Sequence, residues 1–142
     1  MNRCVFCDIA AGVGEAAVLY RDDLVIAFLD INPINPGHLL VVPQKHAARL
    51  ADLDPAAGER IFSVGQKAAS ALYRSELRCE GVNLFLADGH AAGQEIHHVH
   101  LHVLPRFQAD GFRIIRRRFG AAGQKPEQLV EVATVLRGLL SA

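Results

Sequence analysis

Neither sign of charge is in excess in this chain. Its fifteen Lys and Arg residues balance fifteen Asp and Glu residues over 142 positions. A general nucleic-acid binder needs a clear cationic excess to neutralise phosphates, so balanced charge excludes that class. It also excludes an acidic disordered chain. We therefore expect a globular protein with no nucleic-acid partner.

Long hydrophobic runs are absent as well. The longest, from Leu24 to Leu29, is far shorter than the roughly 18 residues that a membrane helix needs. The N-terminal residues MNRCVFCDIAAG do not have the pattern of a secretory signal. These two absences predict a cytoplasmic protein without a membrane partner.

Cysteine is scarce, and its odd count of three does not suit a secreted disulfide framework. Cys4 and Cys7 form a CxxC motif, which in an unexported chain points to metal binding or redox chemistry. A thioredoxin-like redox motif follows a strand, and the sequence predicts no strand before Cys4. Cys79 is expected to be a half-buried apolar residue.

The hydrophobic pattern predicts an α+β fold with a mainly antiparallel sheet. About five strands are expected, at residues 18–20, 24–29, 38–42, 81–86 and 96–104, with Pro43 and Pro105 ending the third and fifth. One long helix is expected from Pro55, with Asp54 as its N-cap, to about Leu77. A C-terminal helix is expected at 126–140. The length suits a single domain over residues 1–142.

Three alternating histidines dominate the last predicted strand. On a strand, His98, His100 and His102 would form a row with steps of about 6.5–7 Å, while Val99 and Leu101 would face the core. A polar strand face in solvent is the alternative without chemistry. Because the opposite side of the strand is apolar, catalysis or metal binding explains the row better.

The row supports two kinds of chemistry. Three imidazoles could hold a catalytic zinc with an open position, or one could act as a nucleophile while the others orient it and hold anionic oxygens. Alternate residues on one strand diverge, which disfavours the metal. The small-residue loop from Gly89 to Gln94 favours phosphate, because its backbone N–H groups can approach an anion.

Several motifs together resemble the histidine-triad (HIT) superfamily of nucleotide hydrolases and transferases. They are HVHLHVL at 98–104 after AGQ at 92–94, FLDINP at 28–33, PGHLLVVP at 36–43, KH at 45–46, PR at 105–106, and CVFCDI at 4–9, as in small bacterial-type members. The resemblance covers the predicted core, about residues 4–112, and implies a HIT-like fold.

The resemblance also implies roles for individual residues. His100 would be the nucleophile at the α-phosphorus of a purine nucleotide, with His102, His38 and Gln94 assisting catalysis. The nucleotide-binding residues would be Phe6, Ile9, Phe28, Asp30, Ile31, Leu40, Gly93, Gln94 and His102. Asp30 would bind the ribose hydroxyls, and the apolar members would line a slot for the base.

The resemblance further implies a structural zinc ion, held by Cys4, Cys7, His46 and His98. A homodimer is typical of the family, and pairing would cover a sheet edge. One position departs from the pattern, since Ala87 stands where many members carry Asn. Asn83 or Asp88 are candidates to replace that amide.

We therefore expect a nucleotide phosphoramidase or nucleotidyl hydrolase that forms a nucleotidyl-histidine intermediate and releases a nucleoside monophosphate. One alternative is a dinucleoside polyphosphate hydrolase, or a phosphorylase or nucleotidyl transferase. Another is a non-catalytic, zinc-stabilised nucleotide-binding module. A basic run of Arg113, Arg116, Arg117 and Arg118 is either a solvated face or a contact for a longer polyphosphate.

Overall fold

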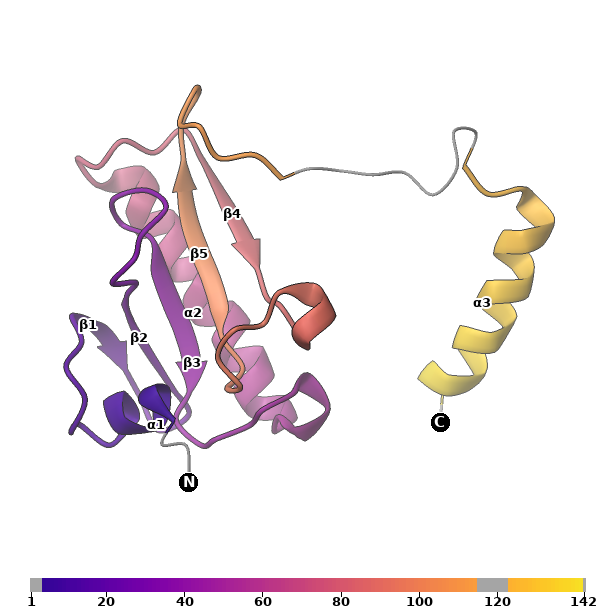
Figure 1. Cartoon of the computed structure of the whole chain (residues 1–142), viewed down its shortest axis with the longest axis horizontal. Helices are drawn as coiled ribbons and strands as arrows, with labels where there is room; N and C mark the ends of the chain where they lie inside the picture. The colour runs from indigo at the N-terminus through magenta and orange to yellow at the C-terminus, as the bar shows by residue number, and fades with distance from the viewer. Residues whose placement is uncertain (1–3, 115–122, 142) are drawn as a thin grey trace. The chain divides into compact units, whose positions relative to one another are not determined.

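The computed structural model describes residues 4–114 and 123–141 (Figure 1). The chain divides after Gly111 into two compact units, Met1–Gly111 and Phe112–Ala142. The division falls at the end of the predicted core. One domain over the whole chain stays a prediction, and each unit is described by itself.

The first unit is built on a five-stranded sheet with the order β1-β2-β3-β5-β4. Every neighbouring pair of strands is antiparallel. The strands are β1 (Val18–Arg21), β2 (Val25–Leu29), β3 (Leu39–Pro43), β4 (Gly81–Phe85) and β5 (Leu101–Arg106). This arrangement confirms the predicted α+β fold class and sheet type.

The two faces of the sheet are covered by different helices. Alternate strand residues, among them Val25, Val41 and Val103, pack against α2 (Pro55–Arg74), which runs behind the sheet in Figure 1. The strand residues between them, Ile26, Phe28, Leu40 and Val42, face α1 (Val5–Ala10). They form a smaller core with Phe6 and Ile9 of that helix. The period of two along a strand thus creates two separate cores.

The predicted strand at 96–104 is wrong at both ends. β5 begins only at Leu101, because its pairing with β3 ends at the Val41–Leu101 pair. Before it, the backbone N–H of Val99 donates to the carbonyl of Ala47 instead of joining the ladder. Pro105 does not end the strand, since it continues through Arg106 in pairing with β4.

The helices differ from prediction in two places. α2 ends at Arg74 instead of Leu77, where the Ser75 hydroxyl and N–H both donate to the Leu72 carbonyl. The six-residue α1 was not predicted, since so short a segment shows no helical period. Among the described residues, no helix is long and apolar enough to span a membrane.

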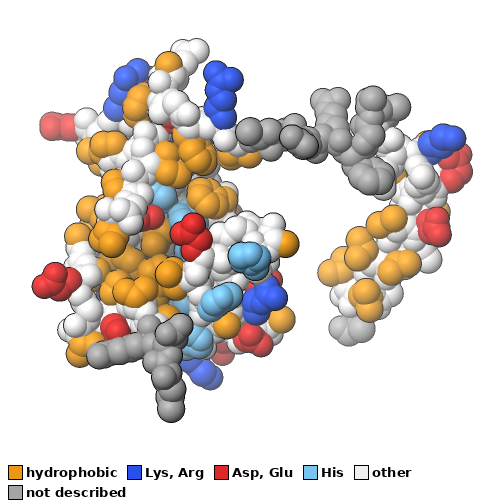
Figure 2. Space-filling view, in the orientation of Figure 1, with side chains coloured by type: hydrophobic (Ala, Val, Ile, Leu, Met, Phe, Trp, Pro, Cys, Tyr) orange, Lys and Arg blue, Asp and Glu red, His pale blue; other side chains and the backbone are white. Residues whose placement is uncertain are grey.

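The second unit contains α3 (Pro126–Leu140), which confirms the predicted C-terminal helix. Figure 2 shows hydrophobic side chains gathered along one face of this helix. The apolar stripe includes Leu129, Leu136 and Leu140, and all three are exposed.

Candidate functional site

The three alternating histidines separate into two groups instead of forming one row. His98 and His100 lie in the irregular segment before β5, and only His102 is in the strand. The ring centroids of His100 and His102 lie 5.0 Å apart on the α1 side of the sheet. The ring of His98 turns toward Cys4 and Cys7. The predicted row on one strand face is therefore wrong, because the backbone leaves the sheet at Leu101.

The position of the proton on His100 follows from its backbone contact. Its Nδ1 lies 2.7 Å from the carbonyl oxygen of His98, which can only accept a hydrogen bond. Nδ1 therefore carries the proton in the neutral ring, and Nε2 carries a free lone pair. No described residue hydrogen-bonds to that Nε2. His100 is 6% exposed and lines a cavity of about 560 Å³.

His38 and His102 form a directed pair beside His100. The backbone N–H of Ile34 donates to His38 Nδ1 over 3.2 Å, so the His38 proton is on Nε2. That group donates to Nδ1 of His102 over 2.9 Å, which places the His102 proton on Nε2. One backbone donor in the loop before β3 thus orders the protons of two rings.

The His pair is neutral at physiological pH. Burial lowers the pKa of His102 to about 4, and the neighbouring rings of His100 and His38 act in the same direction. Burial also lowers the pKa of His38, while the Asp30 carboxylate, 3.7 Å from its Nε2, opposes that shift.

Phe85 is a site residue that sequence reasoning missed. It is the cross-strand partner of His102, and the two rings stack with centroids 4.2 Å apart and planes within 11°. The apolar segment at 81–86 predicts the strand but not its partner. To predict this contact, the register of β4 against β5 would have to be known.

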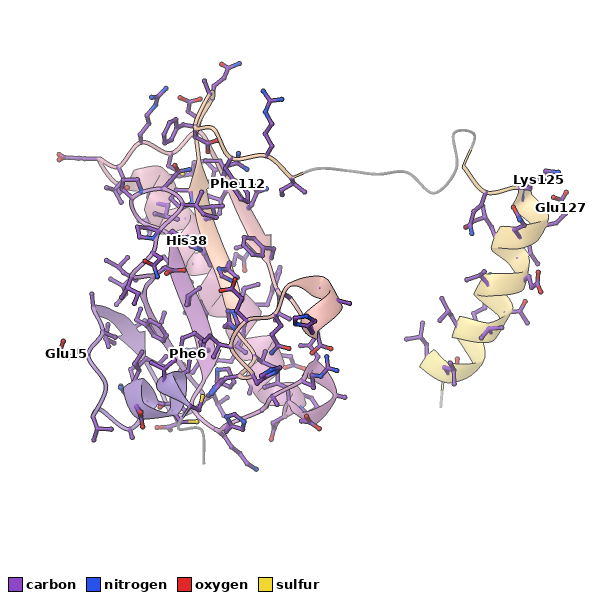
Figure 3. The ribbon with its side chains drawn as sticks, in the orientation of Figure 1. Phe6, Glu15, His38, Phe112, Lys125 and Glu127 are labelled. Atoms are coloured by element: carbon purple, nitrogen blue, oxygen red, sulfur yellow. The ribbon has the colours of Figure 1, made fainter. Side chains whose placement is uncertain are left out.

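The predicted base-binding residues gather at one cavity, which extends from α1 to the His pair (Figure 3). The rings of Phe6 and Phe28 meet edge to face at 5.5 Å. Ile31 also lines the cavity, although it is 86% exposed. The lining includes these predicted residues: Phe6, Ile9, Phe28, Asp30, Ile31, His38, Leu40, Gly93, His100 and His102.

Gln94 is placed differently from its neighbour Gly93. Its side chain is 2% exposed and is not among the cavity-lining residues. Its Oε1 accepts from the N–H of Gly89, and its Nε2 donates to the carbonyl of Ala48, both over 2.8 Å. Gln94 therefore braces the loop, whereas Gly93, in a left-handed conformation (φ 87°), brings backbone to the cavity.

The candidates to replace the missing amide at Ala87 do not line the cavity. Asn83 Oδ1 accepts from Arg106, and Asp88 Oδ1 accepts from the N–H of Leu50. Both side chains are thus engaged in holding other segments.

A second group, suited to a metal, lies at the N-terminus of α1. The ligand atoms of Cys4, Cys7, His46 and His98 all lie within 4.8 Å of one another. Cys4 Sγ is 3.4 Å from His98 Nδ1, and Cys7 Sγ is 3.3 Å from His46 Nδ1. The other nitrogen of His98, Nε2, donates to the carbonyl of Pro43 over 2.9 Å, which leaves Nδ1 free to bind a metal.

The donor set of this cluster fits zinc. Two sulfurs and two imidazole nitrogens are a typical tetrahedral zinc environment. Burial and the neighbouring Cys4 raise the pKa of the Cys7 thiol to about 11. Without a cation the thiol keeps its proton, so a metal here would displace protons as it binds.

The alternative of a catalytic zinc on His98, His100 and His102 finds no support in this geometry. His98 Nδ1 faces the cysteines. Within the described residues, the other group of possible ligands is Asp30, His38 and His102, and its two rings are joined by a hydrogen bond. His38 Nε2 is the donor in that bond, so it has no lone pair to offer a metal.

The basic run is only partly described. Arg113 belongs to the second unit and is exposed. Arg116, Arg117 and Arg118 lie outside the described residues.

Cys79 is half-buried as predicted.

Comparison with known proteins agrees with this architecture. A relative from Borreliella burgdorferi, an "uncharacterized HIT-like protein", is 44% identical over 79% of this chain and 81% of its own. The adenylylsulfatase HINT3 of Arabidopsis thaliana is 35% identical over 77% of this chain and 55% of its own.

Two solved structures extend the comparison. A HIT family protein from Bacillus anthracis matches with a TM-score of 0.89 at 34% identity, over 96% of each chain. A zinc-bound histidine triad family protein from Mycobacterium smegmatis matches with a TM-score of 0.74 at 39% identity, over 80% of this chain and 82% of that one. The sequence profile of the HIT domain matches residues 11–109. Because that match covers most of the chain and agrees with the histidine cluster and the sheet, the protein is a small bacterial-type member of the HIT family.

Proposed function

We propose that this protein is a hydrolase that cleaves nucleotide phosphoramidates at the α-phosphorus through a covalent nucleotidyl-histidine intermediate. One observation carries the proposal. His100 presents a free Nε2 lone pair to the cavity while its Nδ1–H is held by the His98 carbonyl. A neutral imidazole oriented in this way is a competent nucleophile.

In the first step the Nε2 lone pair of His100 attacks phosphorus and forms a P–N bond. The bond from phosphorus to the leaving nitrogen breaks, and its electron pair stays on that nitrogen. The ring becomes a cation, which the His98 carbonyl stabilises by accepting from Nδ1–H over 2.7 Å. Water then attacks phosphorus, the P–Nε2 bond breaks, and the nucleoside monophosphate is released.

The His38–His102 pair would bind the phosphoryl group. In the free protein His102 is neutral and its Nε2 carries a proton. Because His102 Nδ1 accepts from His38, the ring has this one proton, which Nε2 would donate as a hydrogen bond to a phosphoryl oxygen. The departing nitrogen takes its proton from solvent, and the attacking water gives one back to solvent.

The rest of the cavity provides the nucleotide subsites. Phe6, Phe28 and Leu40 offer an apolar slot for a purine base. The Asp30 carboxylate, held by the N–H of Asn32 at 2.8 Å, would accept from the ribose hydroxyls. Gly93 would let a phosphoryl group approach the backbone, because it lines the cavity without a side chain, while its own N–H donates to the carbonyl of His90 over 2.9 Å. The Arabidopsis relative is named an adenylylsulfatase, and this similarity supports cleavage at an adenylyl group in the present protein.

The zinc ion in this proposal is structural, and it would be bound by Cys4, Cys7, His46 and His98. A closed four-ligand shell supplies folding energy and has no position for substrate. Its ligands hold α1, and so the ring of Phe6, against the base slot.

His100→Asn tests the nucleophile. We expect adenosine phosphoramidate turnover to fall by several powers of ten, because the covalent route is lost, while nucleotide binding stays within about tenfold. Acid-labile radiolabel from [³²P]-substrate should attach to the parent protein and not to the variant. Turnover of the variant within about tenfold of the parent would reject the covalent role.

We also propose a homodimer that pairs through an exposed sheet edge. β4 is a terminal strand of the sheet and is only half-buried along its length. An unpaired edge of this kind invites association with a second copy. Sedimentation equilibrium should give twice the chain mass, and a Val82→Pro substitution in β4 should shift the protein toward monomer. A monomeric parent at micromolar concentration would contradict the pairing.

A further inference from the structure

A buried amide, Asn35, holds the loop between β2 and β3, which carries the first donor of the histidine pair. Asn35 is 5% exposed, whereas the four residues before it, 31–34, are exposed. The hydrogen bonds described for residues 31–34 do not reach beyond residues 30–38. The loop lies beside the C-terminal end of β5 (Figure 1), and Asn35 makes its polar contact there. The position of this exposed segment therefore depends on Asn35.

The side chain of Asn35 donates twice. Its Nδ2 lies 2.9 Å from the carbonyl oxygen of Pro105 and 2.8 Å from Oδ2 of Asp110. A carbonyl and an ionised carboxylate can only accept, so the amide nitrogen must face them. The Pro105 carbonyl points toward the β3 edge of β5, because the carbonyl of Arg106 accepts from Glu80 on the opposite edge. Asn35 thus pairs with β5 at a level where β3 has not yet begun.

The carboxylate that receives Asn35 is itself fixed. Arg106 donates to both oxygens of Asp110, from Nε over 2.6 Å and from Nη2 over 2.9 Å. Its Nη1 donates to Oδ1 of Asn83 in β4. A two-point contact of this kind holds a carboxylate in one orientation. The loop is therefore attached, through Asn35, to groups that belong to the sheet.

A tight turn transmits this position to His38. Residues 35–38 (NPGH) form a β-turn, in which the His38 N–H donates to the Asn35 carbonyl over 3.0 Å. Pro36 in second place and Gly37 with a φ of 93° in third place are the features of a type II turn. The N–H of Ile34, just before the turn, donates to His38 Nδ1 over 3.2 Å. This distance is at the long end of the usual range, so a small displacement of the loop would break the contact.

We infer that Asn35 is a positioning residue, which holds the Ile34 N–H against His38 and so keeps the proton of His102 on Nε2. Without the Ile34 donor, His38 can carry its proton on Nδ1, and its Nε2 then accepts from an Nδ1–H of His102. Each ring still has one proton, exchanged through solvent, but the His102 proton has left Nε2.

The consequence for catalysis rests on the proposed function, in which His102 Nε2–H donates to a phosphoryl oxygen. In the reversed pair, Nε2 would present a lone pair to that oxygen. Two acceptors would then face each other, and the charge that develops on the oxygen would lose one donor.

Imidazole ¹⁵N spectra of the ligand-free protein test the inference, because protonated and unprotonated ring nitrogens differ in chemical shift and the measurement needs no turnover. At about pH 7.5, His102 Nε2 of the parent should give a protonated signal. Asn35→Ala should move that signal toward the unprotonated position. Ile34→Pro removes the donor N–H itself and should give the same change with the Asn35 side chain in place.

Asn83→Ala is the matched control. It removes a different side-chain contact of the same network, the one with Arg106, and leaves both hydrogen bonds of Asn35. It should keep the parent spectrum of His102. With adenosine phosphoramidate, Asn35→Ala should lower kcat by about tenfold to a hundredfold, at or below the loss from removing one preorganised donor outright. Asn83→Ala should stay within about twofold of the parent.

The outcomes separate the inference from the proposed function. If Asn35→Ala keeps the parent spectrum of His102, or if Asn83→Ala changes it equally, Asn35 does not set the proton and the inference is overturned. Should Asn35→Ala fail to fold, Asn35→Ser, which keeps a hydroxyl donor, gives the same comparison. A parent that cleaves no phosphoramidate rejects the proposed function, while the spectra still decide the role of Asn35.

Discussion

At the scale of single residues, backbone contacts decide what each histidine can do. His98, His100 and His102 share one side-chain type, yet their ring protons lie on Nε2, Nδ1 and Nε2 respectively. The proton on His100 leaves a nucleophilic nitrogen in the cavity, and the proton on His98 leaves a nitrogen for a metal. The chemistry of the site thus depends on the hydrogen-bond partner of each ring, which is the Pro43 carbonyl for His98, the His98 carbonyl for His100 and the Nε2–H of His38 for His102.

The neutral His102 predicts an acid-sensitive stability. Its pKa is about 4 in the folded protein and about 6.5 when unfolded, so between these values the unfolded chain binds more protons. The free energy of unfolding should therefore fall as the pH drops from 6.5 toward 4. In His102→Asn this contribution is missing, and the stability difference from the parent should shrink with falling pH. Urea unfolding at pH 7 and pH 4.5 measures it, and parallel pH dependences would contradict the assignment.

At the scale of elements, the turn between β1 and β2 is connected to α2 through one carboxylate. Asp22 Oδ1 accepts from the N–H groups of Leu24 and Val25, both at 2.9 Å. Its Oδ2 accepts from the hydroxyl of Tyr20 and from Arg60 of α2. Although burial acts to raise it, these hydrogen bonds hold the pKa of Asp22 well below its usual range. The turn and the helix are therefore fixed together.

Asp22→Ala should lower the free energy of unfolding by about 2–4 kcal/mol, because it leaves several donors without their acceptor. Asp23→Ala is the control, since the neighbouring carboxylate is exposed and has no partner among the described residues. It should change stability by less than about 0.5 kcal/mol. Equal effects of the two substitutions in urea unfolding would show that the turn contacts contribute nothing.

At the scale of the whole first unit, the metal cluster connects three segments that are distant in sequence. Cys4 is the N-cap residue of α1 and Cys7 lies within that helix, His46 follows β3, and His98 precedes β5. A zinc ion would cross-link them, and the benefit is largest where the chain between ligands is long. The ring of Phe6 contacts both His98 and His100. A metal bound by this cluster would therefore also hold Phe6 in place beside the cavity.

Elemental analysis should find about one zinc per chain. Cys7→Ser should lose the metal and lower the melting temperature. Cys79→Ser should keep it, because Cys79 lies outside the cluster. His100→Ala should also keep the metal while losing turnover. If His100→Ala loses zinc and Cys7→Ser retains it, the histidines themselves hold the metal and the nucleophile mechanism is wrong.

The sequence by itself determined the elements and the chemical types at the site. Short apolar segments bounded by turn residues predict the strands, Asp54 and Pro55 predict where α2 begins, and the HVHLHV motif predicts a histidine site, because all of these depend on residues close in the chain. Only the tertiary structure decided that His98 leaves the row, that Gln94 braces the loop, and that Phe85 stacks on His102. The acceptor for His98 Nε2, the carbonyl of Pro43, is 55 positions away in the chain. Contacts of that range depend on strand order and register, and no local pattern encodes them.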